Sequence, residues 1–268
     1  MLPENKKVNR DVTQALKIWV YGKPNIGKTT FANQFPDTLM LNTDGNIKGV
    51  DSPCVSIGGE TPWEDFVNTV DEILKGDHTF KTIVVDLTED VYQYCRNYYC
   101  KKLKIDHEAD LGYGKGYDII KNAFLIVLRK LCNTEYNVIL CSHEKEVVIK
   151  DRIGRETTVF KPNIGDTIAT KISGMVEMTA RLSSESITDE EGQQHDERRL
   201  FFGAASDIFT GNKIKGLQED YIVMTETEGY NTLIKNIKND KKVEVKKEEV
   251  KKEDKKVDDM LVVRKKEN

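Results

Sequence analysis

Residues 16–30, LKIWVYGKPNIGKTT, decide the fold of this chain. Residues 16–21 form a short apolar run rich in strand-forming residues, which is typical of a β-strand buried on both faces. The eight residues from Gly22 to Thr29 then match the pattern GxxxxGK followed by Ser or Thr, and a helical pattern begins at Lys28 and ends before Pro36. A strand, a glycine-rich loop and a helix in this order predict a phosphate-binding loop, or P-loop, in an α/β domain.

The residue types of the P-loop account for phosphate binding. Gly22 and Gly27 let the backbone curl so that successive amide N–H groups point at phosphate oxygens. Lys28 would reach the β- and γ-phosphates, and the Thr29 hydroxyl would bind Mg²⁺. A plain glycine turn is the alternative, and the flanking strand and helix argue against it. The predicted nucleotide-binding residues are Gly22, Lys23, Pro24, Asn25, Ile26, Gly27, Lys28, Thr29 and Thr30.

Short apolar runs alternate with helical patterns as far as residue 141. Because parallel strands need long crossover connections, this alternation predicts a mostly parallel sheet with helices on both faces. The expected strands are 38–42, 82–86 and 137–141, and the expected helices are 63–75, 90–104 and 117–131.

The pattern changes after residue 146. A hairpin with Gly154 in its turn comes first, and short strands are expected at 175–182 and 198–203, separated by a polar loop at 183–197. These segments predict antiparallel strands at the C-terminal edge of the sheet.

Charge divides the chain into two parts. The 268 residues include 41 Lys+Arg and 45 Asp+Glu, a net charge of −4. Residues 237–268 hold 12 basic and 9 acidic residues, which predicts one domain at 1–236 and a charged, disordered tail at 237–268. The domain carries a net charge of −7, which excludes a basic, histone-like nucleic-acid binder. The apolar cluster at 260–263 is either a partner-binding motif or an idle end of the tail.

The cysteines and the hydropathy of the sequence indicate in which cellular compartment the protein is expected. The five cysteines form no CxxC pair and lie mostly in apolar runs, so we expect reduced core thiols in a cytosolic protein. The four His residues share no spacing with them, which argues against a Cys/His metal centre. No run approaches the roughly 18 apolar residues of a membrane span, and the first 14 residues hold no apolar signal segment. We therefore expect no membrane partner.

Two carboxylates follow expected strands at the edge where open α/β sheets bind ligands. Asp86 could hold a magnesium-bound water facing Thr29, or it could merely cap the following turn. Asp44 lies near enough to the P-loop to polarise an attacking water, or it forms an Asx turn with Gly45. Both carboxylates are candidate catalytic residues.

A polar group also closes the strand at 137–141. His143 or Ser142 could hydrogen-bond the γ-phosphate or the attacking water, and an exposed histidine without a task is the alternative. No NKxD-like guanine motif occurs, so ATP is the expected nucleotide.

With the P-loop, Asp44, Asp86 and His143 in this order, the chain resembles the phage-encoded RecA-like P-loop ATPases, often labelled phage nucleotide-binding proteins. One branch of these is the RecA-like group of Sak single-strand annealing proteins. The resemblance covers roughly residues 15–223, including the strand ending TIVVD and the element LGYGKGY at 111–117. It implies a RecA-like fold that binds ATP and Mg²⁺, with Asp44 in the place of the water-activating glutamate.

The resemblance further implies where partners bind. In RecA-like proteins the segment equivalent to 144–171 faces DNA, although a solvated hairpin is the alternative from the residues alone. Lys213 and Lys215 resemble the paired lysines that touch a neighbouring subunit's nucleotide, which implies a homo-oligomer; otherwise they form a turn after Gly211. The basic residues of the segment are Lys145, Lys150, Arg152, Arg155, Lys161 and Lys171.

The combined interpretation is a DNA-stimulated ATPase of a phage or prophage. It would act on single-stranded DNA in recombination or annealing, in the cytoplasm of the bacterial host, and could recruit a single-strand-binding or other recombination protein through its tail. A nucleotide-binding switch or loader without direct DNA function is the second interpretation. A small-substrate phosphotransferase is the third, and it is disfavoured because the sequence shows neither a lid nor a second basic phosphate clamp.

Overall fold

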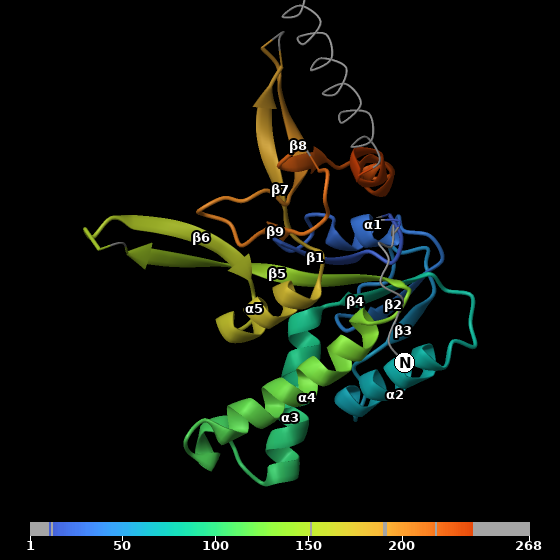
Figure 1. Ribbon diagram of the computed structural model, residues 1–268, viewed down its shortest axis with the longest axis vertical. Helices are drawn as coiled ribbons and strands as arrows, with labels where there is room; N and C mark the ends of the chain where they lie inside the picture. The colour runs from blue at the N-terminus through green and yellow to red at the C-terminus, as the bar shows by residue number, and fades with distance from the viewer. Residues whose placement is uncertain (1–10, 12, 151, 190–191, 218, 238–268) are drawn as a thin grey trace, which may run out of the picture.

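A largely parallel sheet organises the structure, a computed structural model that describes residues 11, 13–150, 152–189, 192–217 and 219–237 (Figure 1). The strands lie in the order β10-β8-β7-β1-β5-β4-β2-β3, with β6 paired to β5 and β9 paired to β7. The strands are β1 (Lys17–Gly22), β2 (Thr38–Asn42), β3 (Cys54–Ser56), β4 (Thr82–Asp86), β5 (Asn137–Lys150), β6 (Glu156–Pro162), β7 (Met178–Thr188), β8 (Gln194–Phe201), β9 (Gly211–Asn212) and β10 (Tyr221–Val223). The helices are α1 (Lys28–Asn33), α2 (Pro62–Lys75), α3 (Thr88–Leu103), the short 3₁₀ helix η1 (Glu108–Leu111), α4 (Lys115–Cys132) and α5 (Asp166–Met175).

The pairing directions confirm the predicted α/β class. Strands β3, β2, β4, β5, β1 and β7 pair in parallel, whereas β8, β9 and β10 add antiparallel pairs at the edge formed by the C-terminal half. The predicted hairpin is also present, because β5 and β6 are antiparallel and Gly154 in their turn has φ 82°. The sheet is therefore mostly parallel, as the crossover spacing predicts.

Helices cover both faces of the sheet. Successive residues of a strand point to opposite sides, so the apolar residues of a buried strand need a covering layer on each face. On β1, Trp19 packs with α2, α3, α4 and α5, whereas Ile18 and Val20 pack with α1 on the other face. Residues 229–237 are also helical and place Leu233 and Ile237 in the same layer as α1. Figure 1 shows α2 to α5 on one side of the sheet and α1 on the other. Ile237 is 2% exposed, so the core extends one residue beyond the expected boundary at 236, and 238–268 lie outside the described residues.

The expected polar loop at 183–197 is wrong. Strands β7 and β8 extend through it and pair in register as far as Thr188 and Gln194. This hairpin projects from the body in Figure 1, so both of its faces meet solvent and its sequence lacks the apolar alternation of a half-buried strand. Helix α5 and strand β3 were not expected either, and the strand expected at 175–182 begins only at Met178.

The described residues also bear on the cysteine and membrane expectations. All five cysteines are free thiols, and four of them are buried. No helix in the described part of the chain is both long enough and apolar enough to cross a membrane.

Candidate functional site

The P-loop connects β1 to α1 in the conformation that its residues allow. Gly27 has φ 108° and Asn25 has φ 61°, and both glycine and asparagine tolerate this left-handed region. At Gly22 the loop runs so close to β7 that a Cβ would collide with the carbonyl oxygen of Leu182. The structure therefore requires both glycines of the motif. Gly27 is required for its positive φ angle, and Gly22 is required because there is no room for a side chain.

Lys28 folds back over the P-loop. Its side chain is buried, and Nζ donates to the carbonyl oxygens of Gly22 at 3.1 Å and Lys23 at 2.8 Å. Burial lowers the pKa of Lys28, and nearby acidic groups oppose this shift. Among the residues that the structure describes, the ammonium therefore bonds two neutral carbonyls over the loop, where an anion would be a stronger partner.

Thr29 and Asp86 face each other as the sequence predicts. The Thr29 hydroxyl donates to Asp86 Oδ2 at 2.8 Å. Burial raises the pKa of Asp86, and the hydrogen bond from Thr29 opposes this shift. A hydroxyl beside a carboxylate fits Mg²⁺, which is bound in such sites by few protein groups together with phosphate oxygens. Among the described residues no group of three or more His, Cys, Asp or Glu could hold a metal ion without such phosphates.

The strand register brings the other predicted residues to the same edge. Gly22 pairs with His143 across β1 and β5, and Asp86 pairs with Asn42 across β4 and β2. Ser142 is fully buried and accepts a hydrogen bond from the indole N–H of Trp19 at 3.0 Å. His143 is half-buried, so of the two candidates at this strand it is the one nearer the surface of the site.

Asp44 lies in an exposed turn after β2. Its Oδ1 accepts from Asn42 Nδ2 at 2.9 Å and from the backbone N–H of Asn46 at 2.8 Å, while Asn42 Oδ1 accepts from Gly45 N at 2.8 Å. The Asx-turn alternative is therefore formed. Asp44 is also close enough to Asp86 for its charge to help raise the pKa of that carboxyl. A role of Asp44 toward water stays a prediction.

Glu89 is a site residue that the sequence did not indicate. Its Oε1 accepts from the backbone N–H of His143 at 2.7 Å and lies 3.1 Å from His143 Nδ1. The side chain is 11% exposed, and burial raises the pKa of Glu89. The sequence places it just before the helix expected at 90–104, in no motif, and the structure places it in the first turn of α3, where an acidic residue favours the helix dipole. In the structure it holds both the backbone and the ring of His143 in place.

Lys213 and Lys215 follow β9, and Lys213 bonds the end of α5. Lys213 Nζ donates to the carbonyl oxygens of Ser173, Gly174 and Val176 at 2.8, 2.9 and 2.6 Å, so it caps the C-terminal end of α5. Lys215 is exposed. Their contact with a neighbouring subunit's nucleotide stays a prediction.

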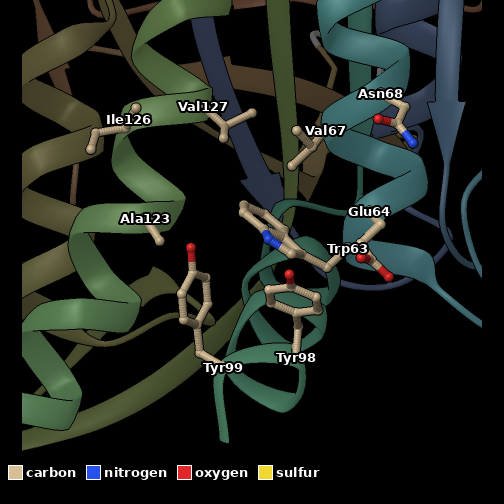
Figure 2. Close-up of a pocket in the computed structure, with 9 residues that line it drawn as sticks. All are labelled: Trp63, Glu64, Val67, Asn68, Tyr98, Tyr99, Ala123, Ile126 and Val127. Carbon is tan, nitrogen blue, oxygen red and sulfur yellow. The ribbon is translucent and has the colours of Figure 1, made fainter. Parts of the chain in front are cut away.

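A pocket of about 440 Å³ lies elsewhere, between α2, α3 and α4 (Figure 2). Trp63, Tyr98 and Tyr99 line it, and none of its residues belongs to the P-loop or to the neighbouring strand ends. The residues predicted to bind the nucleotide therefore lie at the sheet edge and not in this pocket.

Comparison with known proteins identifies the family of the chain. No curated protein matches the chain. A family model described as an AAA domain matches residues 14–214, a range that includes the P-loop, Asp44, Asp86 and His143. Because this match spans most of the chain, the chain belongs to the AAA domain family and carries a P-loop ATPase-type domain.

Proposed function

We propose that the chain is an ATP-binding and ATP-hydrolysing phage protein that acts on single-stranded DNA in recombination or annealing, in the cytoplasm of its bacterial host. The observation that carries the proposal is the grouping of Lys28, the Thr29–Asp86 pair and His143 at one sheet edge. The strand that bears His143 continues directly into a projecting hairpin. A nucleotide site and a DNA-facing surface would thus share one element.

The P-loop edge suits hydrolysis of ATP by water. Lys28 would bind the β- and γ-phosphates, and Thr29 and Asp86 would hold Mg²⁺, which when bound neutralises phosphate charge. Asp44 would orient the water whose oxygen attacks the γ-phosphorus as the bond to the bridging oxygen breaks, giving ADP and phosphate. His143, held by Glu89, would lie within reach of the γ-phosphate or this water.

Substitutions of Asp44 distinguish its role in the Asx turn from its proposed role in orienting the attacking water. Asn is as good an Asx-turn residue as Asp, so Asp44→Asn should keep the turn and the affinity for ATP but lower the hydrolysis rate by roughly tenfold to a hundredfold. Asp44→Glu should match or exceed the wild-type rate. Phosphate release measured against Asp51→Asn, another exposed aspartate, provides the control. A full rate in Asp44→Asn would show that another group orients the water.

The β5–β6 hairpin is the proposed DNA surface. Val148, Ile149 and Ile153 are exposed along it, at 58%, 44% and 84%. Lys150 pairs with Glu156 at 2.8 Å, and Lys161 pairs with Asp166 at 3.1 Å, so part of its positive charge is already neutralised within the chain. Exposed apolar and basic side chains together suit a single strand, which offers both base faces and phosphates.

Charge reversal on the hairpin tests this surface. Lys150→Glu with Arg152→Glu should weaken single-stranded DNA binding at least tenfold and abolish DNA stimulation of hydrolysis, because like charges would replace contacts to phosphate. ATP affinity without DNA should not change. Lys101→Glu with Lys102→Glu on α3 is the matched control. DNA-independent hydrolysis by a wild-type protein that binds no DNA would favour the alternative, a nucleotide-dependent switch or loader that recruits a protein partner.

The proposal includes assembly into a homo-oligomer. Lys213 and Lys215 would then approach a nucleotide held by the neighbouring subunit, once Lys213 leaves the α5 carbonyls that it now caps. A recombination or single-strand-binding protein would be recruited through the tail, whose residues 260–263 lie outside the described part of the chain.

A further inference from the structure

Two strands at the sheet edge place side chains directly against the P-loop. A Cβ on Gly27 would lie 3.2 Å from Met224 Cε, 3.4 Å from Arg198 Nη1 and 3.9 Å from Arg198 Cδ. Arg198 belongs to β8, and Met224 follows β10 and donates its backbone N–H to the Arg198 carbonyl oxygen at 2.9 Å. The guanidinium of Arg198 is therefore held beside the P-loop by a paired element of the same chain.

Arg198 has no acceptor within the described residues, unlike its neighbours. Arg199 bonds Glu197 at 2.6 Å and Glu185 at 3.1 Å, and Arg181 bonds Glu144 at 2.9 Å. Arg198 is half-buried, yet in the described part of the chain its guanidinium makes neither a hydrogen bond nor an ion pair. A guanidinium that lies beside a phosphate-binding loop without an acceptor is available to an anion, because hydrogen bonds between ionised partners are among the strong ones.

We propose that Arg198 binds the α- and β-phosphates of a nucleoside di- or triphosphate held by the P-loop of the same chain. This inference rests on the proposed function and deepens it. The backbone of a P-loop cradles the α- and β-phosphates, whereas its lysine reaches the β- and γ-phosphates. Because Arg198 lies against Gly27, it serves the first of these two regions, and its planar fork suits two phosphate oxygens at once.

Arg198 provides a second positively charged group for the phosphates, which the sequence did not indicate. Contact from within the chain separates its role from that of Lys213 and Lys215, which would act only across a subunit interface. A monomer should therefore depend on Arg198 for nucleotide affinity. ATP and ADP should depend on it equally, because they share the α- and β-phosphates.

Equilibrium binding of ATP, ADP and AMP in the presence of Mg²⁺ tests the proposal. Arg198→Gln keeps much of the stem that lies beside Gly27 but removes the charge. We expect it to weaken ATP and ADP binding about tenfold or more, and by equal factors, with a smaller loss for AMP, which keeps the α-phosphate but lacks the β-phosphate. Arg198→Lys should recover part of the loss, and Arg199→Gln is the matched control, with melting temperatures showing that each variant is folded.

The outcomes separate this inference from the proposed function. Wild-type affinity for ATP and ADP in folded Arg198→Gln would overturn the role of Arg198 and leave the proposed function standing. A loss confined to ATP would also overturn it, because Arg198 would then contact the γ-phosphate. A wild-type protein that binds neither nucleotide would overturn the proposed function and this inference with it.

Discussion

Replacing Lys28 with alanine should weaken Mg-ATP binding by about a hundredfold or more while the protein stays folded. The ammonium of Lys28 is a buried, charged donor that lies over the P-loop, and hydrogen bonds to charged partners are the strong ones. Within the described part of the chain its hydrogen-bond partners are two loop carbonyls, so the fold loses little when it is removed. Calorimetric titration with ATP and a thermal melt measure the two parts of this prediction.

The control for Lys28 is Lys48→Ala. Lys48 is exposed in the loop after β2, so its removal takes one positive charge from the surface without touching the P-loop. Unchanged ATP affinity in folded Lys28→Ala would show that residues 22–29 are not the nucleotide site. An equal loss in Lys48→Ala would show that only overall charge matters.

Asp86→Asn should lower hydrolysis by about a hundredfold and at the same time stabilise the nucleotide-free protein at neutral pH. Turnover falls because the carboxylate acts through the metal and its water, whereas Asn still accepts the Thr29 hydrogen bond. Stability rises because burial raises the pKa of Asp86, which means that the fold disfavours the ionised form. The gain should be present at neutral pH and disappear as the pH falls below the ordinary value of 3.8, where both states bind the proton.

Melting temperatures of the wild type and Asp86→Asn at several pH values check the second effect, and phosphate release checks the first. Asp77→Asn, an exposed aspartate between α2 and β4, is the control for adding an amide. A lower melting temperature in Asp86→Asn at neutral pH would mean that the charged carboxylate stabilises the fold. Full turnover would remove Asp86 from the metal site.

The parts of the fold that local pattern controls were predictable. Strands β2 and β4 match their predicted limits, since five consecutive residues buried on both faces leave an unmistakable apolar run. Strand β5 was predicted to end near Cys141 but continues to Lys150, because its second half leaves the core and becomes polar. The outer part of hairpin β7–β8, expected as a loop at 183–197, was missed for the same reason. A strand segment with solvent on both faces has no alternation of apolar and polar residues by which the sequence would indicate it.

The candidate site likewise contains residues that the sequence indicated and residues that it did not. Lys28 and Thr29 could be predicted as site residues from a motif, and Asp86 from its position at a strand end. Glu89 and Arg198 belong to no motif, and their positions come from tertiary contacts. Glu89 reaches His143 only because β4 and β5 are neighbours, and Arg198 reaches Gly27 only because β8 pairs with β7, which in turn pairs with β1. Their partners are 54 and 171 positions away along the chain, which single-sequence patterns do not register.

The most direct measurement of the central claim is the affinity of the full chain for a labelled single-stranded oligonucleotide, with and without ATP and Mg²⁺. We predict tight binding with both present, and at least tenfold weaker binding when ATP is omitted or when Lys28→Ala replaces the wild type. Double-stranded DNA of the same length should compete poorly. Binding that is absent, or that is the same with and without Mg-ATP, would contradict an ATP-dependent role on single-stranded DNA.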